Sequence, residues 1–176
     1  SAGRTPTPVG MKYYVEQLMK PKDLSVAEEV AVKEKVWSYR QEIDKLLREA
    51  TKALAEKTKT LAITATNEGD LYYSGAANIL DMPEFYDYQL THELVGTLDE
   101  YAFWWKVLEL HDAPFSILVG DDLSTGALTQ CGFVYYKFKT SHVTGAIGVI
   151  GPSRLNYPTV IPVVRYLGNL IDEFAS

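Results

Sequence analysis

The stretch "GAIGVIGPSRLNYPTVIPVV", residues 145–164, decides how the C-terminal part of the chain folds. Glycine recurs at every third position of its apolar first half, which predicts a strand that another backbone approaches closely. Pro152 and Pro158 then stiffen the passage into a terminal helix over about 158–174, which caps the sheet. We interpret the junction as a structural motif formed by Gly148, Gly151, Pro152, Arg154 and Tyr157.

The turn "GPSR", residues 151–154, allows a second interpretation. Glycine-rich backbone before a helix can direct amide groups toward an anion, and Arg154 would add a fork of donors. The turn lacks the lysine and the spacing of a P-loop. An enzyme that held a phosphate here would lose activity in Arg154→Ala and keep its fold. We expect the reverse, with Arg154 bound to neighbouring carbonyl groups or a carboxylate, so that its loss lowers stability.

The segments before this stretch alternate between strand and helix patterns. Alternating, β-branched or buried apolar residues predict strands in "KTLAITATN" (59–67), "DLYYSG" (70–75), "PFSILVG" (114–120) and "TQCGFVYYKFK" (129–139). Apolar positions at helical spacing predict one helix over 88–110. Together with the final strand and helix, this order predicts an α+β domain over residues 59–176, in which helices pack on an antiparallel sheet.

A long helix is predicted before this domain, over residues 24–58. Ser25 followed by Glu28 is the capping-box pattern of a helix start. The apolar positions that follow step by three or four residues and form one stripe, which includes Val32, Val36, Tyr39, Ile43, Leu46 and Leu54. Such a stripe either packs on the sheet of its own domain or forms a coiled-coil-like seam with a second copy. The sequence leaves both alternatives open.

Charge divides the chain into two unlike parts. The 176 residues carry a net charge of −6, and the 47 % apolar and 23 % charged composition is that of a globular protein. Residues 1–60 hold 12 of the 17 Lys and Arg but only 9 of the 23 Asp and Glu, so the remainder is strongly acidic. Because an acidic surface repels phosphate backbones, any contact with nucleic acid should come from the N-terminal end. We expect Arg4 and Lys12 to lie nearest to DNA.

The residue pattern argues against catalysis, a metal and a cofactor. His92, His111 and His142 lie in different predicted elements, without the spacing of a metal site. The acidic pairs at 121–122 and 172–173 lie beside turns or the chain end, where carboxylates are usually solvated. The single cysteine, Cys131, fits a reducing compartment. No apolar stretch approaches the roughly 20 residues that cross a bilayer. We therefore expect a cytoplasmic protein without a membrane partner.

Four segments, in order, resemble the HrcA family of bacterial heat-inducible transcription repressors: "SAGRTPTPVGMKYYVEQL" (1–18), "LLREATKALAEKTKTLAI" (46–63), "LYYSGAANILDMPEF" (71–85) and "GAIGVIGPSRLNYPTVIPVVRYL" (145–167). The resemblance implies a GAF-like sheet and a homodimer that binds an inverted-repeat operator upstream of chaperone genes. It also implies a GroEL-type chaperonin as partner. Residues 1–23 would be the remnant of a link to a winged-helix domain that is missing here, so operator DNA would be bound through that domain.

The sequence departs from the family pattern in one respect. Relatives carry an inserted dimerisation segment between the first GAF-like strand and "LYYSG", whereas here only "TATNEGD" separates them. The stripe of residues 32–54 is therefore the candidate dimerisation seam. An alternative function is small-molecule sensing, because GAF-like folds often hold a ligand against the sheet. The side chains available to line such a pocket are Tyr72, Tyr73, Trp104, Trp105, Tyr135 and Tyr136.

Overall fold

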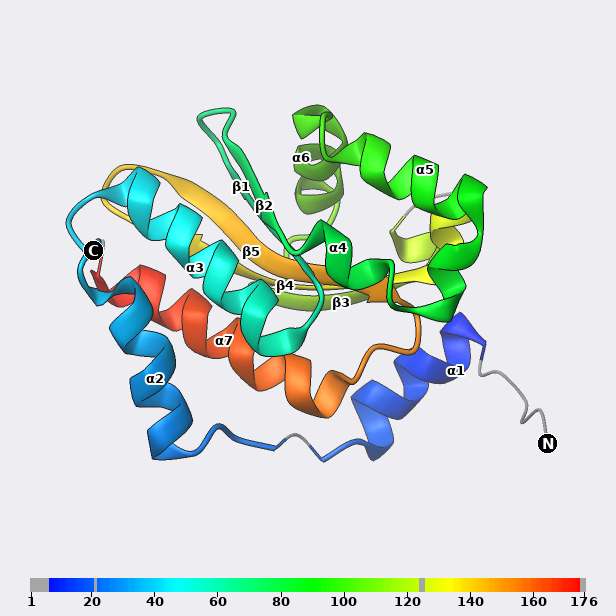
Figure 1. Ribbon diagram of the computed structural model, residues 1–176, viewed down its shortest axis with the longest axis horizontal. Helices are drawn as coiled ribbons and strands as arrows, with labels where there is room; N and C mark the ends of the chain where they lie inside the picture. The colour runs from blue at the N-terminus through cyan, green and yellow to red at the C-terminus, as the bar shows by residue number, and fades with distance from the viewer. Residues whose placement is uncertain (1–6, 21, 124–125, 175–176) are drawn as a thin grey trace.

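The computed structural model describes residues 7–20, 22–123 and 126–174. Five strands form one antiparallel sheet in the order β2-β1-β5-β4-β3 (Figure 1). The strands are β1 (Leu61–Thr66), β2 (Leu71–Ser74), β3 (Phe115–Val119), β4 (Cys131–Lys139) and β5 (Thr144–Pro152). The sheet and its packed helices confirm the predicted α+β fold.

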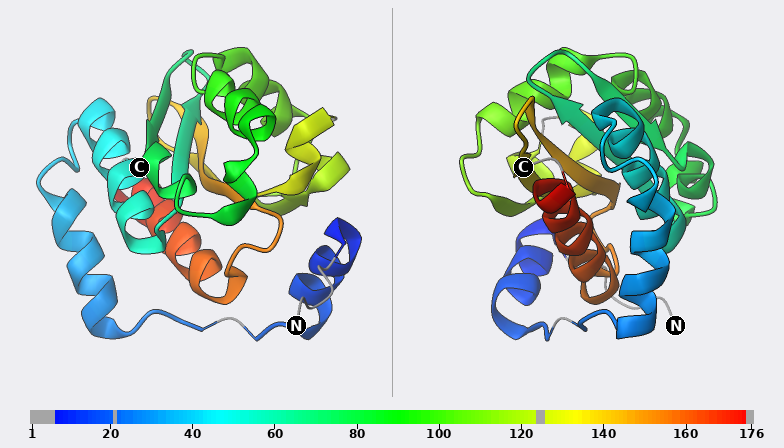
Figure 2. Two further views of the ribbon diagram at one scale, coloured as in Figure 1. Left: turned by 45° about the vertical axis from the view of Figure 1, so that its right-hand side comes forward. Right: turned by 90° about the vertical axis from the view of Figure 1, so that its left-hand side faces the viewer.

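Helices cover both faces of this sheet (Figure 1). One face carries α2 (Val26–Trp37), α3 (Ile43–Thr58) and α7 (Tyr157–Phe174). The other carries α4 (Ala76–Ile79), η2 (Pro83–Tyr86), α5 (Tyr88–Thr97), α6 (Tyr101–Glu109) and η4 (Gly126–Gln130). The N-terminal α1 (Pro8–Tyr13) and the π-helical η1 (Tyr14–Leu18) lie at the β3 edge, far from α2, as both views of Figure 2 show.

The sheet separates two hydrophobic cores that share β5. Alternate residues of a strand point to opposite faces. Ile147 and Val149 therefore enter the core beneath α3 and α7, whereas Ala146 and Ile150 enter the core beneath α4–α6. All four side chains are almost fully buried. The middle strand of the sheet is thus a common wall of both cores.

Glycine is required in β5 because the neighbouring strand lies very close. A Cβ at Gly148 would overlap the carbonyl oxygen of Val134 and lie 2.8 Å from the Phe133 ring. Tyr135, the residue opposite Gly148 in β4, would also be in contact. The close approach predicted from the glycine spacing is present at this position.

The predicted single helix over 24–58 is two helices. α2 ends at Trp37 and α3 begins at Ile43, with a turn between them. Arg40 stabilises this turn, because its guanidinium donates a 2.9 Å hydrogen bond to the Trp37 carbonyl. The apolar stripe continues across the break, since Val36 is buried and Tyr39 packs against the same core. The stripe therefore gave no signal that the helix ends.

The predicted helix over 88–110 is also divided. α5 ends at Thr97 and α6 begins at Tyr101. The indole of Trp104 donates a 3.1 Å hydrogen bond to the Thr97 carbonyl, which folds α6 back against the end of α5. No helix among the described residues is long and apolar enough to cross a bilayer.

Candidate functional site

The junction after β5 uses its polar groups inside the protein. The Ser153 amide donates a 2.9 Å hydrogen bond to the Gln130 carbonyl, and the Tyr157 hydroxyl donates a 2.7 Å bond to the Ser153 carbonyl. Burial raises the pKa of Tyr157 above its ordinary value. The phenol therefore stays protonated and remains a donor. These bonds close the turn that the sequence motif predicts.

Arg154 binds a carboxylate at this junction. Its guanidinium nitrogen lies 2.7 Å from Glu84 Oε1, which joins the turn to η2. The second carboxylate oxygen, Glu84 Oε2, is buried and has no hydrogen-bond partner among the described atoms. Because Arg154 is already engaged by an acidic side chain, the turn is poorly suited to an anion.

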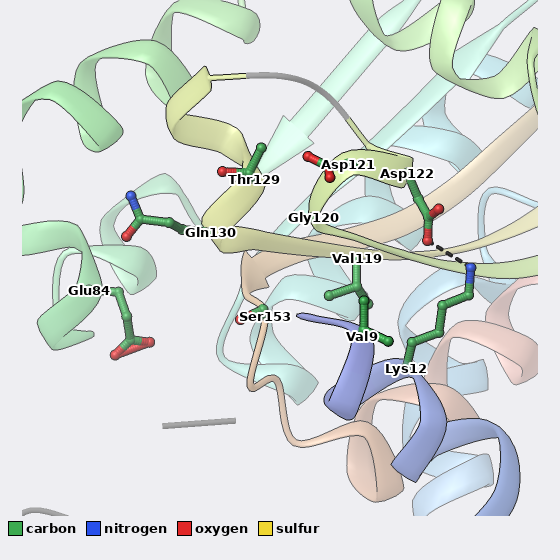
Figure 3. Close-up of a pocket in the computed structure, with 10 residues that line it drawn as sticks. All are labelled: Val9, Lys12, Glu84, Val119, Gly120, Asp121, Asp122, Thr129, Gln130 and Ser153. Carbon is green, nitrogen blue, oxygen red and sulfur yellow. Dashed lines mark hydrogen bonds and ion pairs between the residues drawn. The ribbon is translucent and has the colours of Figure 1, made fainter. Parts of the chain in front are cut away.

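An open groove of about 710 Å³ lies beside the junction (Figure 3). Five separate parts of the chain line it: α1, η2, the end of β3 with the following η3 (Gly120–Asp122), η4 and the β5–α7 turn. The lining residues are Val9, Lys12, Glu84, Val119, Gly120, Asp121, Asp122, Thr129, Gln130 and Ser153. Figure 3 shows Glu84 on one side of the groove and Lys12, pointing to Asp122, on the other.

Lys12 holds α1 against the body of the domain. Its ammonium lies 2.7 Å from Asp122 Oδ2, and His111 Nε2 lies 3.1 Å from the Asp122 carbonyl oxygen. Lys12, one of the two residues expected near DNA, is thus paired with an acid of the same chain. Arg4, the other, lies outside the described residues.

A metal cluster and a reactive thiol, two common catalytic elements, are not found in the part of the chain that the structure describes. Among the described residues, no three His, Cys, Asp or Glu side chains are close enough to hold a metal ion. Cys131 is fully buried, and its burial, assisted by the Glu84 carboxylate, raises the thiol pKa to about 12. The thiol is therefore protonated at neutral pH, and the thiolate that a nucleophile requires is not formed.

The six aromatic residues considered for a sensor pocket are dispersed over the fold. Trp104 and Tyr135 fill the core beneath α4–α6. Tyr136 lies on the opposite face, where its hydroxyl donates a 2.7 Å hydrogen bond to Asp172. Tyr72 bonds to α3, Tyr73 is half exposed and Trp105 bonds to Glu109 within its own helix. These side chains do not line one common cavity.

The predicted dimerisation seam faces the chain's own core. Val32, Val36, Leu46 and Leu54 are at most 3 % exposed and lie in the core beneath α3 and α7. Tyr39 and Ile43 are partly buried against the same cluster. The sequence left two alternatives open for this stripe. In the single chain, the stripe packs on the sheet of its own domain.

The sequence alone did not indicate the groove. Gln130 and Thr129 carried no motif, and the acidic pair at 121–122 resembled an ordinary solvated turn. Lys12 and Asp122 are 110 positions apart, so nothing in their local surroundings links them. Only the packing of α1 against β3 brings them together.

The family model described as the HrcA protein C terminal domain matches residues 10–161 of this chain. The chain belongs to the HrcA family. Two HrcA relatives are each described as "Heat-inducible transcription repressor HrcA". The protein of Ruminiclostridium cellulolyticum is 30 % identical over 126 residues, which cover 69 % of this chain and 36 % of the relative. The protein of Nitratidesulfovibrio vulgaris is 31 % identical over 136 residues, which cover 71 % and 38 %. The chain thus spans less than half the length of these HrcA proteins.

A solved structure supports the fold of this HrcA-family chain. It is described as "Crystal structure of a hypothetical protein at 2.2 A resolution" and superposes with a TM-score of 0.71 at 12 % identity. The match covers 99 % of this chain and 80 % of that one. At this identity the similarity concerns the fold alone, and it agrees with the predicted GAF-like arrangement of the sheet and helices.

Proposed function

We propose that this chain is the regulatory and dimerisation part of a heat-inducible transcription repressor that acts on chaperone-gene operators. The observation that carries the proposal is the HrcA family match over residues 10–161. The packing is consistent with a role without catalysis, because the ionisable side chains of the junction and groove pair with one another or face solvent. We also infer a cytoplasmic location and, from the family resemblance, a GroEL-type chaperonin as partner.

In this proposal, two copies place two DNA-reading domains at the spacing of an inverted repeat. A twofold protein symmetry matches a palindromic operator, since each reader then meets an identical half-site. Residues 1–23 would connect each body to its winged-helix domain, outside this chain. The ion pair between Lys12 and Asp122 supports this role, because it fixes the end of the connection to the body. Dissociation or unfolding of the dimer on heating would then release the operator.

The test compares full-length protein with residues 1–176 on a duplex that carries the inverted repeat upstream of a chaperone gene. We expect the full-length protein to sediment as a dimer and to bind the full repeat at least tenfold more tightly than a single half-site. Residues 1–176 should bind neither duplex. A monomeric full-length protein that binds half-site and full repeat equally would contradict the proposal.

The groove favours a second candidate function, the sensing of a small cationic ligand. Glu84 Oε2 is buried without a partner at one end of the groove, and Asp121 is exposed on its rim. A ligand that binds only the native state raises the melting temperature. We therefore expect amines such as spermidine or arginine to raise it in the wild type and not in Asp121→Asn. No shift with any amine at millimolar concentration would exclude this function.

A further inference from the structure

Helix α2 has a second apolar face that points away from the core. Val32 and Val36 are buried beneath it, yet Val26, Val30 and Trp37 are 77 %, 50 % and 46 % exposed. With the half-buried Lys33, these positions step by four, three and four residues, which is the spacing of a coiled-coil seam. We call Val26, Val30, Lys33 and Trp37 the outer stripe. It lies on a different face of α2 from Val32 and Val36, and at one end of it Lys33 and Trp37 border Phe174 of α7.

The outer stripe contains a ready hole for a side chain of another helix. A shallow hollow of about 330 Å³ is lined by Val30, Lys33, Glu34 and Trp37. These are positions i, i+3, i+4 and i+7, the four residues that form the hole in knobs-into-holes packing. The centre of the Trp37 ring lies 4.3 Å from the Arg40 guanidinium carbon, and the ring packs at 81° to that of Phe174, with 5.4 Å between their centres. Because the indole is held in place, the hole is preorganised.

We propose that the outer stripe pairs with the outer stripe of a second copy, with the two α2 helices antiparallel. In this register Val26 of each copy packs against Trp37 of the other, and Val30 packs against Lys33. This inference deepens the proposed function, because it rests on the homodimer and names the surface that forms it.

The charge of Lys33 favours an antiparallel over a parallel arrangement of the two α2 helices. A parallel pair would place Lys33 directly opposite its own copy, and like charges in one layer repel. The antiparallel pair instead places each Lys33 opposite Val30, which Glu29 and Glu34 flank on the same helix. Within its own chain the Lys33 ammonium lies 5.4 Å from the centre of the Trp37 ring and 5.6 Å from that of Phe174. In the antiparallel pair it would also approach these two carboxylates of the second copy. A single Lys at a seam position is also a known determinant of register.

The length of α2 sets the strength of the pairing. Its 12 residues extend about 18 Å, so the contact area falls below that of a standard stable interface. We therefore expect residues 1–176 to dimerise reversibly at micromolar or higher concentration. Helix α2 lies away from α1, so pairing through α2 leaves α1 uncovered (Figure 2).

The first test compares Val30→Asp with Val95→Asp by sedimentation over a concentration series, in full-length protein and in residues 1–176. Val95 is a matched control, because it is 43 % exposed on α5. We expect Val30→Asp to raise the dimer dissociation constant at least tenfold and Val95→Asp to leave it unchanged, with melting curves showing that both variants fold. A dimer that persists in Val30→Asp overturns this inference and leaves the proposed function intact. If the wild type is monomeric both as full-length protein and as residues 1–176, this inference and the proposed function are both wrong.

The second test determines the orientation by cross-linking. Val26→Cys and Trp37→Cys are made separately, and each is oxidised alone and in an equimolar mixture. Cys131 does not interfere because it is fully buried. The antiparallel register predicts that the mixture forms a disulfide-linked dimer several times faster than either variant alone. Equal or faster linkage of each variant with itself would overturn the proposed orientation.

Discussion

Arg154 and Glu84 are 70 positions apart in the chain, yet a guanidinium nitrogen and a carboxylate oxygen of the pair lie 2.7 Å apart. The pair ties the turn after β5 to η2, on the side of the groove opposite Lys12. Since the Glu84 side chain is only 25 % exposed, the loss of Arg154 would leave its charge without its cation in a partly buried place.

Arg154→Ala should therefore lower the free energy of unfolding by about 1 kcal/mol, the scale of a half-exposed ion pair. Urea unfolding of the two single variants and of the double variant with Glu84→Ala measures the coupling. The double variant should lose less free energy of unfolding than the two single variants lose when their losses are added. Strictly additive losses would show that the ion pair contributes nothing to stability.

Gly148→Ala should destabilise the domain by about 1–3 kcal/mol, because the new methyl group overlaps the Val134 carbonyl and forces the strands apart. Gly96→Ala is the matched control, since a Cβ there meets nothing within 4 Å and the position is helical. This control should gain about 0.4–1 kcal/mol. Thermal melts of both variants test this prediction. If Gly148→Ala melted at the same temperature as Gly96→Ala, the close approach of the strands at Gly148 would be refuted.

Leu46→Ala should lower stability by about 2–5 kcal/mol without changing the dimer dissociation constant measured on folded protein. Leu46 is fully buried in the chain's own core, so its truncation leaves a cavity there. Chemical unfolding and sedimentation on the same samples separate the two effects. A variant of unchanged stability that dissociates more readily would support the dimerisation seam predicted from the sequence.

Cys131 should make stability fall as the pH rises above about 8.5. The native thiol has its pKa raised to about 12 by burial, whereas the unfolded thiol titrates near its ordinary value of about 8.5. Between these two pH values the unfolded chain loses the proton and the native chain keeps it, which favours unfolding by about 1.4 kcal/mol per pH unit. Below pH 8.5 the contribution is fully present.

The measurement compares wild type with Cys131→Ala by urea unfolding at pH 7.5, 9.0 and 10.0. The stability advantage of the wild type should shrink at each step, whereas the raised pKa of Tyr136, about 12, affects both proteins equally above pH 10. A constant difference across this range would mean that the native thiol is not shielded.

The sequence predicts most of this fold because its local signals agree with the final packing. Ser25 caps α2 as its pattern indicates, with the Glu28 amide 3.2 Å from the hydroxyl oxygen. All five strands lie where alternation or buried runs predict them. These features depend on neighbouring residues, which a sequence displays directly.

The missed features arise from contacts between distant residues. The turn between α2 and α3 contains no glycine or proline, and its apolar residues keep helical spacing because Tyr39 and Ile43 still face the core. The groove and the Lys12–Asp122 pair depend on where α1 packs. The outer stripe is hard to recognise in the sequence for another reason. Helix α2 carries two apolar faces, and the apolar positions of the longer stripe alternate with those of the shorter one.

The central position of β5 has a consequence for how the domain should unfold on warming. Both helical layers pack on β5, so the loss of either layer would expose one face of a strand that the other layer needs. Melting should then be one concerted event, which confines the loss of structure to a narrow range of temperature. If the chain acts in the heat-dependent release proposed above, such steepness would turn a gradual rise in temperature into a threshold.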